Sequence, residues 1–140
     1  MIVFESLPAD IRERLPLAAN VLEKDDSVVF AYLFGGFAED RITPLSDIDI
    51  AVYLRGEGSH AERKMRLFDA ITDALGTSEI DLVVLNDAQI SLVGRIIQGR
   101  RILVDKEPFV RHRFESIRLR EFFDFRIKEE QMFRRRFADG

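Results

Sequence analysis

The chain contains no cysteine, which excludes both a disulfide framework and a metal site built from thiolates. None of its apolar runs reaches the roughly 20 residues that a helix needs to span a bilayer. The N-terminus carries early acidic residues and no basic segment, so it does not resemble a signal peptide. We therefore expect no membrane partner and a cytoplasmic location. There is no repeat or low-complexity linker, and the 140 residues are expected to form one domain.

The composition indicates a folded protein whose charge is unevenly distributed. Hydrophobic residues make up 46% of the chain and charged residues 33%, which is typical of a globular protein rather than a disordered one. Residues 111–140 contain nine Lys or Arg and six Asp or Glu, a balance of +3, so the net charge of -4 leaves -7 for the remainder. A general nucleic-acid binder would be dominated by a basic stripe, so we expect no direct nucleic-acid binding. The basic C-terminal segment is instead expected to meet something acidic.

The apolar residues follow helical and strand periods in turn, which predicts helices interleaved with strands. Residues 27–34 are almost continuously apolar and predict a strand buried on both faces. Pro16 interrupts the first helical pattern and predicts a kink or two short helices. This order around one buried sheet indicates an α/β layer architecture. The other expected elements are helices at 61–75, 88–98 and 109–137, and strands at 47–54, 80–85 and 101–105.

The most informative stretch joins the first two expected strands. A glycine pair, Gly35 and Gly36, ends the first strand, and Asp47 and Asp49 open the second after ten intervening residues. Residues i and i+2 of a strand point to the same side, so these two carboxylates can converge on a hard cation such as Mg²⁺. Residues without side chains let backbone N–H groups approach a phosphate closely. The simpler alternatives are a tight glycine turn and a solvated, capped loop. The combination favours phosphoryl or nucleotidyl transfer.

A third acid lies within the expected strand at residues 80–85. Asp81 has apolar neighbours, and a carboxylate in such company is costly unless it is paired, hydrated or bound to a metal. If this strand lies beside the one that carries Asp47 and Asp49, Asp81 completes a cluster of three carboxylates. Glu79 is the nearest competitor and ranks second because it precedes the apolar run. The remaining alternative is an aspartate at the strand edge that faces water.

The glycine, ten-residue and Asp-x-Asp spacing resembles the signature of the polymerase-β-like nucleotidyltransferases. At this length the chain most resembles their minimal members, the MNT antitoxins encoded beside HEPN toxins. The sequence departs from that motif at Gly36, where the family usually has serine, and at residues 39–40, where it usually has Arg-Gly. The matching positions are Gly35, Phe37, Ala38, Ser46, Asp47, Ile48 and Asp49.

The resemblance implies a polymerase-β-like nucleotidyltransferase core with a mixed sheet and a long C-terminal helix. It also implies transfer of AMP from Mg·ATP to a hydroxyl, a tyrosine on a cognate HEPN ribonuclease toxin, which the modification silences. Asp47 and Asp49 would then bind the metal, and Asp81 would be a further metal ligand and the base that deprotonates the hydroxyl. No second substrate domain fits in this length, which favours a protein acceptor over an antibiotic.

The expected phosphate-binding residues follow from the glycine pair and from the places where the sequence departs from the family motif. The backbone of Gly35 and Gly36 would hold the β- and γ-phosphates, Ser46 would brace the loop, and Arg41 would compensate for the acids at 39–40. A glycine at position 36 removes one hydroxyl donor to a phosphate, typically worth about 1.5–3 kcal/mol when the partner is charged. Two alternatives stay open: an antitoxin that acts by binding alone with a weakened site, and a small-molecule nucleotidyltransferase. The sequence also leaves open the base preference, the number of AMPs and any homo-oligomer.

The expected C-terminal helix has apolar residues on more than one face and arginines around them. A helix that packs only on its own domain needs a single apolar face. Its first half either folds back over the sheet, with its arginines in water, or meets a partner. Its second half combines Phe and Met with Arg, a composition typical of interfaces. We therefore divide the chain into a catalytic core, residues 1–108, and a partner-binding helix, residues 109–138.

Overall fold

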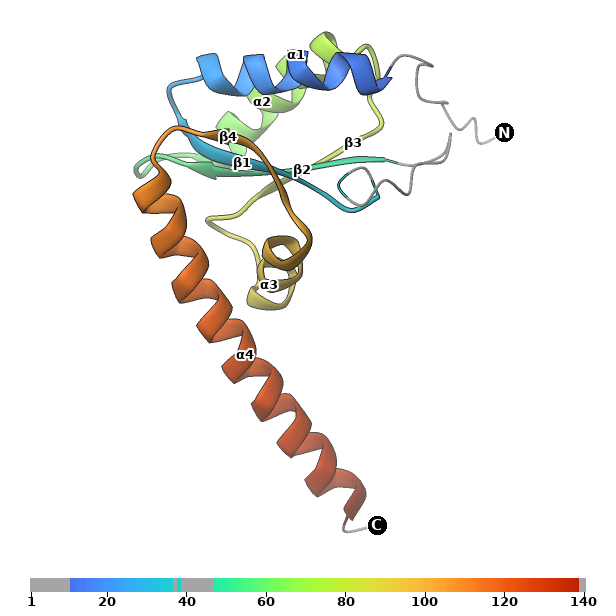
Figure 1. Cartoon of the computed structure of the whole chain (residues 1–140), viewed down its shortest axis with the longest axis vertical. Coiled ribbons are helices and arrows are strands. Elements are labelled where there is room, and N and C mark those ends of the chain that lie inside the picture. Colours follow the sequence, from blue (N-terminus) through green and yellow to red (C-terminus); the bar gives the residue numbers. More distant parts are fainter. Residues whose placement is uncertain (1–10, 37, 39–46, 139–140) are drawn as a thin grey trace, which may run out of the picture.

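A four-stranded sheet separates two pairs of helices in the computed structural model, which describes residues 11–36, 38 and 47–138 (Figure 1). Helices α1 and α2 cover one face of the sheet, and α3 and α4 lie on the other. The elements are α1 (Ile11–Lys24), β1 (Val28–Phe34), β2 (Ile48–Leu54), α2 (His60–Leu75), β3 (Ile80–Val84), α3 (Ile90–Gly99), β4 (Arg101–Asp105) and α4 (Pro108–Ala138).

The strand order is β3-β2-β1-β4, and the sheet is mixed. β1 is antiparallel to both β2 and β4, whereas β2 and β3 are parallel. All but the last residue of β1 are buried, which agrees with the prediction of a strand covered on both faces. The mixed sheet and the long C-terminal helix confirm the expected fold class.

The two faces of β2 have different roles. Ile48, Ile50 and Val52 pack into the core beneath α1 and α2. Ala51 packs on the opposite face with residues of α3 and with Phe114 of α4. Because side chains alternate along a strand, Asp49 lies on the same face as Ala51, toward α3 and α4.

Of the two alternatives predicted at Pro16, a kink or two short helices, the second is wrong, because α1 is continuous from Ile11 to Lys24. Pro16 is exposed, while Ile11, Ala18 and Leu22 are buried on either side of it. A proline inside a helix removes one backbone hydrogen bond. Burial of apolar residues in turns before and after Pro16 holds the helix together across this defect.

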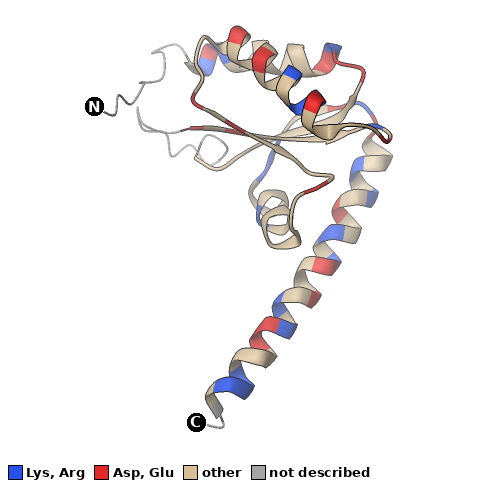
Figure 2. Ribbon diagram, turned by 180° about the vertical axis from the view of Figure 1, so that it is seen from behind, with Lys and Arg blue, Asp and Glu red and all other residues tan. Residues whose placement is uncertain are grey.

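The first half of α4 packs on the molecule and its second half extends away from it (Figure 1). Phe122 is buried against Gly94 of α3, where an added Cβ would lie 2.2 Å from the phenylalanine ring. Beyond Phe122, residues 123–137 are all exposed. Figure 2 shows acidic and basic residues interspersed along this helix. No helix in the described part of the chain is long and apolar enough to cross a membrane.

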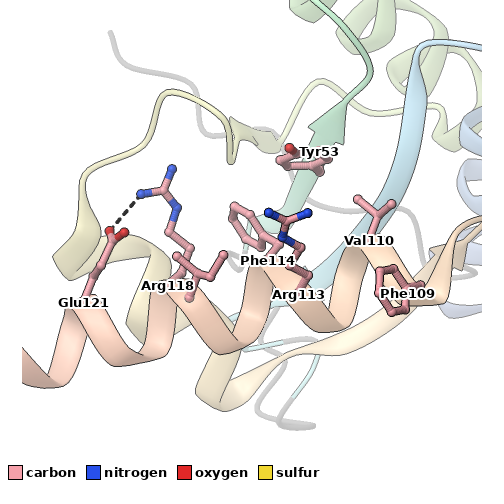
Figure 3. Close-up of a pocket in the computed structure, with 8 residues that line it drawn as sticks. Tyr53, Phe109, Val110, Arg113, Phe114, Arg118 and Glu121 are labelled. Atoms are coloured by element: carbon pink, nitrogen blue, oxygen red, sulfur yellow. Dashed lines mark hydrogen bonds and ion pairs between the residues drawn. The ribbon is translucent and has the colours of Figure 1, made fainter.

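A groove of about 440 Å³ lies where the base of α4 passes Tyr53 of β2 (Figure 3). Its wall includes Phe109, which is 82% exposed, and Phe114, whose ring packs on Tyr53 with 5.0 Å between the ring centroids. At the far end Arg118 forms an ion pair with Glu121 at 2.9 Å. The groove therefore combines apolar walls with a charged rim.

Candidate active site

Two parallel strands bring the predicted carboxylates together at one end of the sheet. Asp49 of β2 is directly paired with Asp81 of β3 in the strand register. Neighbouring strands lie about 4.8 Å apart, and paired residues project to the same face. Asp47 immediately precedes β2 and is exposed, two residues from Asp49. All three carboxylates thus belong to the face that carries α3 and α4.

The charges of these acids act on one another. The pKa of Asp49 is raised from 3.8 to about 6, first by burial and then by the negative charges of Asp81 and Asp47. A divalent cation would offset this repulsion, and a set of carboxylate oxygens suits Mg²⁺. The side chains do not form a closed ligand set, because no group of three or more His, Cys, Asp or Glu among residues 11–36, 38 and 47–138 is placed to hold a metal ion.

A turn without side chains lies against the central carboxylate. Phe34, the last residue of β1, is paired with Asp49, and Gly35 follows with a φ of 69°. A Cβ on Gly35 would lie 2.1 Å from Oδ2 of Asp49, so only glycine permits this approach. Gly36 continues the turn and is partly exposed. The predicted glycine pair and the predicted acids are therefore neighbours in space.

The glycine turn and the three acids lie in a part of the chain that matches a known protein family. The model of the polymerase beta nucleotidyltransferase family matches residues 18–109, a range that includes the glycine turn and all three acids. The chain belongs to this family. The resemblance to polymerase-β-like nucleotidyltransferases that the motif indicated is therefore confirmed for the family. No curated protein matches the chain.

Solved structures with the fold of this nucleotidyltransferase include toxin–antitoxin complexes. A chain of a toxin–antitoxin crystal structure with AMP-PNP is 21% identical, with a TM-score of 0.64 over 89% of this chain and 95% of that one. A chain of the MntA–HepT complex is 19% identical, with a TM-score of 0.59 over 91% and 96%. A chain in a structure of the tri-AMPylated Shewanella oneidensis HEPN toxin in complex with MNT antitoxin is 19% identical to this chain. Its TM-score is 0.60, and the match covers 92% of this chain and 96% of that one.

The remaining predicted site residues differ in what the structure says of them. Ser46 and Arg41 lie outside the described residues, as do Phe37 and the acids at positions 39 and 40. Glu79 immediately precedes β3, and its carbonyl accepts a hydrogen bond from the Ile48 N–H at 3.0 Å. Asp81, and not Glu79, contributes to the raised pKa of Asp49.

The sequence did not predict that residues of α2 lie beside Asp81. Lys64 and Met65 line the space next to Asp81, and Met65 is 69% exposed. Periodicity alone groups Met65 with the apolar core positions of the helix, because it cannot tell which side of α2 the sheet covers. Only the placement of β3 at the sheet edge shows that Met65 is not a core residue.

Replacing Gly35 with alanine is expected to impair the site more than it destabilises the fold. The new Cβ would displace the Asp49 carboxylate, whereas Gly56 has the same φ of 69° and open space around it. Gly56→Ala therefore carries the backbone strain alone, of order 1–2 kcal/mol. We expect Gly35→Ala to lose about tenfold or more in Mg·AMP-PNP affinity by calorimetry, and Gly56→Ala to retain it. Equal affinities would show that Gly35 does not position Asp49.

Proposed function

We propose that this nucleotidyltransferase moves AMP from Mg·ATP to a hydroxyl, a tyrosine, of a cognate HEPN toxin and thereby neutralises it in the cytoplasm. The observation that carries the proposal is the repulsive group of Asp47, Asp49 and Asp81 beside the bare turn at Gly35. Carboxylates that disfavour one another and adjoin a side-chain-free backbone are suited to a metal-bound triphosphate.

The three acids have distinct tasks in this proposal. Asp47, Asp49 and Asp81 would hold Mg²⁺, which when bound neutralises charge on the triphosphate. Asp81 is exposed on an edge strand, so it can meet an incoming hydroxyl and accept its proton. The hydroxyl oxygen forms a bond to the α-phosphorus, and the bond between that phosphorus and the bridging oxygen breaks to release pyrophosphate. Backbone N–H groups of Gly35 and Gly36 bind the β- and γ-phosphates.

A protein acceptor is supported by the second half of α4. This segment exposes large apolar side chains beside basic ones, and an apolar patch of this kind is typical of an interface. A similar structure contains AMP-PNP, and another contains an AMPylated HEPN toxin with an MNT antitoxin. The exposed apolar residues are Phe123, Phe125, Ile127, Met132, Phe133 and Phe137.

The same segment favours a second candidate, an antitoxin that neutralises its partner by binding alone. Residues 123–137 offer contact area away from the carboxylates, and Gly36 with the acids at 39–40 departs from the usual phosphate-binding motif. In that case the protein would protect cells without any transfer.

Intact mass measurement separates these candidates. The chain is incubated with the HEPN protein encoded beside it and with Mg·ATP, and we expect the partner to gain the mass of one or more AMP groups. A reaction with EDTA serves as the control. An unmodified partner in a stable complex would support binding alone, and labelled AMP on a metabolite would support a small-molecule enzyme.

A further inference from the structure

We propose that the acceptor protein docks as an extended segment along the open edge of β3, and that this segment carries the hydroxyl to Asp81. The inference rests on the proposed transfer of AMP to a protein and specifies how the acceptor reaches the site. It assigns the edge of the sheet and the adjoining face of α2 as the acceptor site.

β3 ends the strand order, so one side of its backbone has no partner strand among the described residues. Backbone groups of successive strand residues point alternately to the two sides. The Glu79 carbonyl accepts from the Ile48 N–H at 3.0 Å, and the Leu85 N–H donates to the Val52 carbonyl at 2.8 Å. Odd-numbered residues therefore bond to β2, and the N–H and C=O groups of Leu82 point to the open edge.

Two cavities flank this edge and together form a trough beside β3. The larger, of about 630 Å³, extends over Met65 and Phe68 of α2. The smaller, of about 420 Å³, extends toward His60 and Ala88. The residues common to both are Ala61, Lys64, Asp81 and Leu82. The two cavities thus meet at the expected base, Asp81, and the trough follows the strand on both sides of it.

An extended peptide is the occupant that satisfies these features together. Its backbone can pair with the outward N–H and C=O of Leu82, as in recognition by strand addition. A residue paired with Asp81 projects to the same face as Asp81, which places its hydroxyl beside the carboxylate. The next residue projects to the α2 side, into the cavity over Met65 and Phe68. We therefore expect the modified residue to be followed or preceded by an apolar one.

The charges along the trough favour a single acidic side chain in the acceptor segment, placed opposite Lys64. Lys64 lines both cavities and forms no ion pair with a residue in the described ranges. His60, the other basic side chain of the trough, is already held by Asp87 at 2.7 Å. An acidic side chain of the acceptor would pair with Lys64, and the carboxylates of Asp69, Asp81 and Asp87 along the trough would disfavour a second one.

The first test places a bulky cation in the trough. We expect Met65→Arg to slow AMP transfer to the partner at least about tenfold while Mg·AMP-PNP affinity stays within about twofold of wild type. Leu17→Arg is the matched control, because Leu17 is also an exposed apolar residue but lies on α1. Unchanged transfer by Met65→Arg would overturn the proposal. Loss of nucleotide affinity would assign the trough to the nucleotide. Loss of self-association with retained transfer would assign the trough to a second copy of the chain. Either of these outcomes would also overturn the proposal.

The second test does not depend on catalysis. Hydrogen exchange of the Leu82 amide is compared for wild type alone and in complex with the partner, and we expect slower exchange in the complex. If the wild type adds no AMP, the proposed function fails, but this amide still reports docking. Unchanged exchange at Leu82 in a formed complex would overturn the proposal.

Discussion

Asparagine at position 49 is expected to stabilise the protein in EDTA and, in the same molecule, to abolish AMP transfer. The pKa of Asp49 is raised from 3.8 to about 6 by burial and then by Asp81 and Asp47, so the folded state disfavours the ionised carboxylate at pH 7. About two pKa units correspond to roughly 3 kcal/mol, and partial exposure reduces this to about 1–2 kcal/mol. This loss of stability lies at the position where a bound metal and triphosphate would remove the repulsion between the carboxylates.

The pH dependence gives this prediction a defined sign. The folded state binds the proton of Asp49 more tightly than the unfolded state, so wild-type stability falls as pH rises from about 4 to about 6. The advantage of Asp49→Asn should thus be complete above pH 6 and vanish below its ordinary pKa of 3.8. Thermal unfolding in EDTA at several pH values measures it. Asp73→Asn, at an exposed position of α2, is the control and should match wild type.

The activity of the same variant tests the proposed function. We expect transfer to fall at least about 10³-fold, because the carboxylate would hold the cation that stabilises the transferred group. The double variant Asp47→Asn/Asp49→Asn should then fail to protect cells from the toxin. Protection equal to wild type would favour neutralisation by binding alone. A lower stability of Asp49→Asn in EDTA would instead show that Asp49 is held by a favourable partner.

The elements around the site could be predicted because their signals are local. A continuous apolar run indicated β1, and strand periodicity predicted that Asp47 and Asp49 project to one side at the start of β2, which begins one residue after Asp47. Gly76 ends α2 in the left-handed conformation, and its N–H donates to the Thr72 carbonyl at 2.8 Å, as a terminal glycine predicts. Each of these inferences depends on residues a few positions apart.

The features that could not be predicted depend on which elements become neighbours. Nothing within residues 80–85 indicates that β3 is parallel to β2, although this pairing brings Asp81 beside Asp49. The same limit applies to the helix. The first half of α4 folds back over the sheet, an arrangement in which its arginines were expected in water. Arg111 is nevertheless only 7% exposed, because α4 passes close to the end of β4 there. The position of a basic residue in the helical pattern does not show whether its side chain is buried.

This buried arginine belongs to an ionic cluster at the base of α4. Glu115 is 8% exposed and accepts hydrogen bonds from Arg111 at 2.5 Å and from Arg100, the residue after α3. Arg111 also lies 3.0 Å from Asp105 of β4. The cluster thus joins the first half of α4 to the C-terminal end of α3 and to the sheet.

Replacing Glu115 with alanine is therefore expected to destabilise the protein by about 3–5 kcal/mol. The buried guanidinium of Arg111 and the partly exposed one of Arg100 would lose their shared carboxylate. Removing one partner of a buried ion pair is far more costly than removing an exposed one. Burial alone would raise the pKa of Glu115, but hydrogen bonds from Arg100 and the charge of Arg111 hold it below its ordinary value. This contribution is present above that value and is lost as pH falls through the lower folded pKa.

Denaturant unfolding of matched variants measures the effect. Glu121→Ala removes an exposed carboxylate of the same helix that pairs with Arg118, and we expect a loss below about 1 kcal/mol. Glu115→Gln keeps the shape and an acceptor, so it should fall between the two and show a weaker acid dependence. If Glu115→Ala and Glu121→Ala cost the same, the cluster is not what holds α4. If only Glu115→Ala is severe, the orientation of the exposed half of α4, and with it the proposed partner surface, depends on one buried carboxylate.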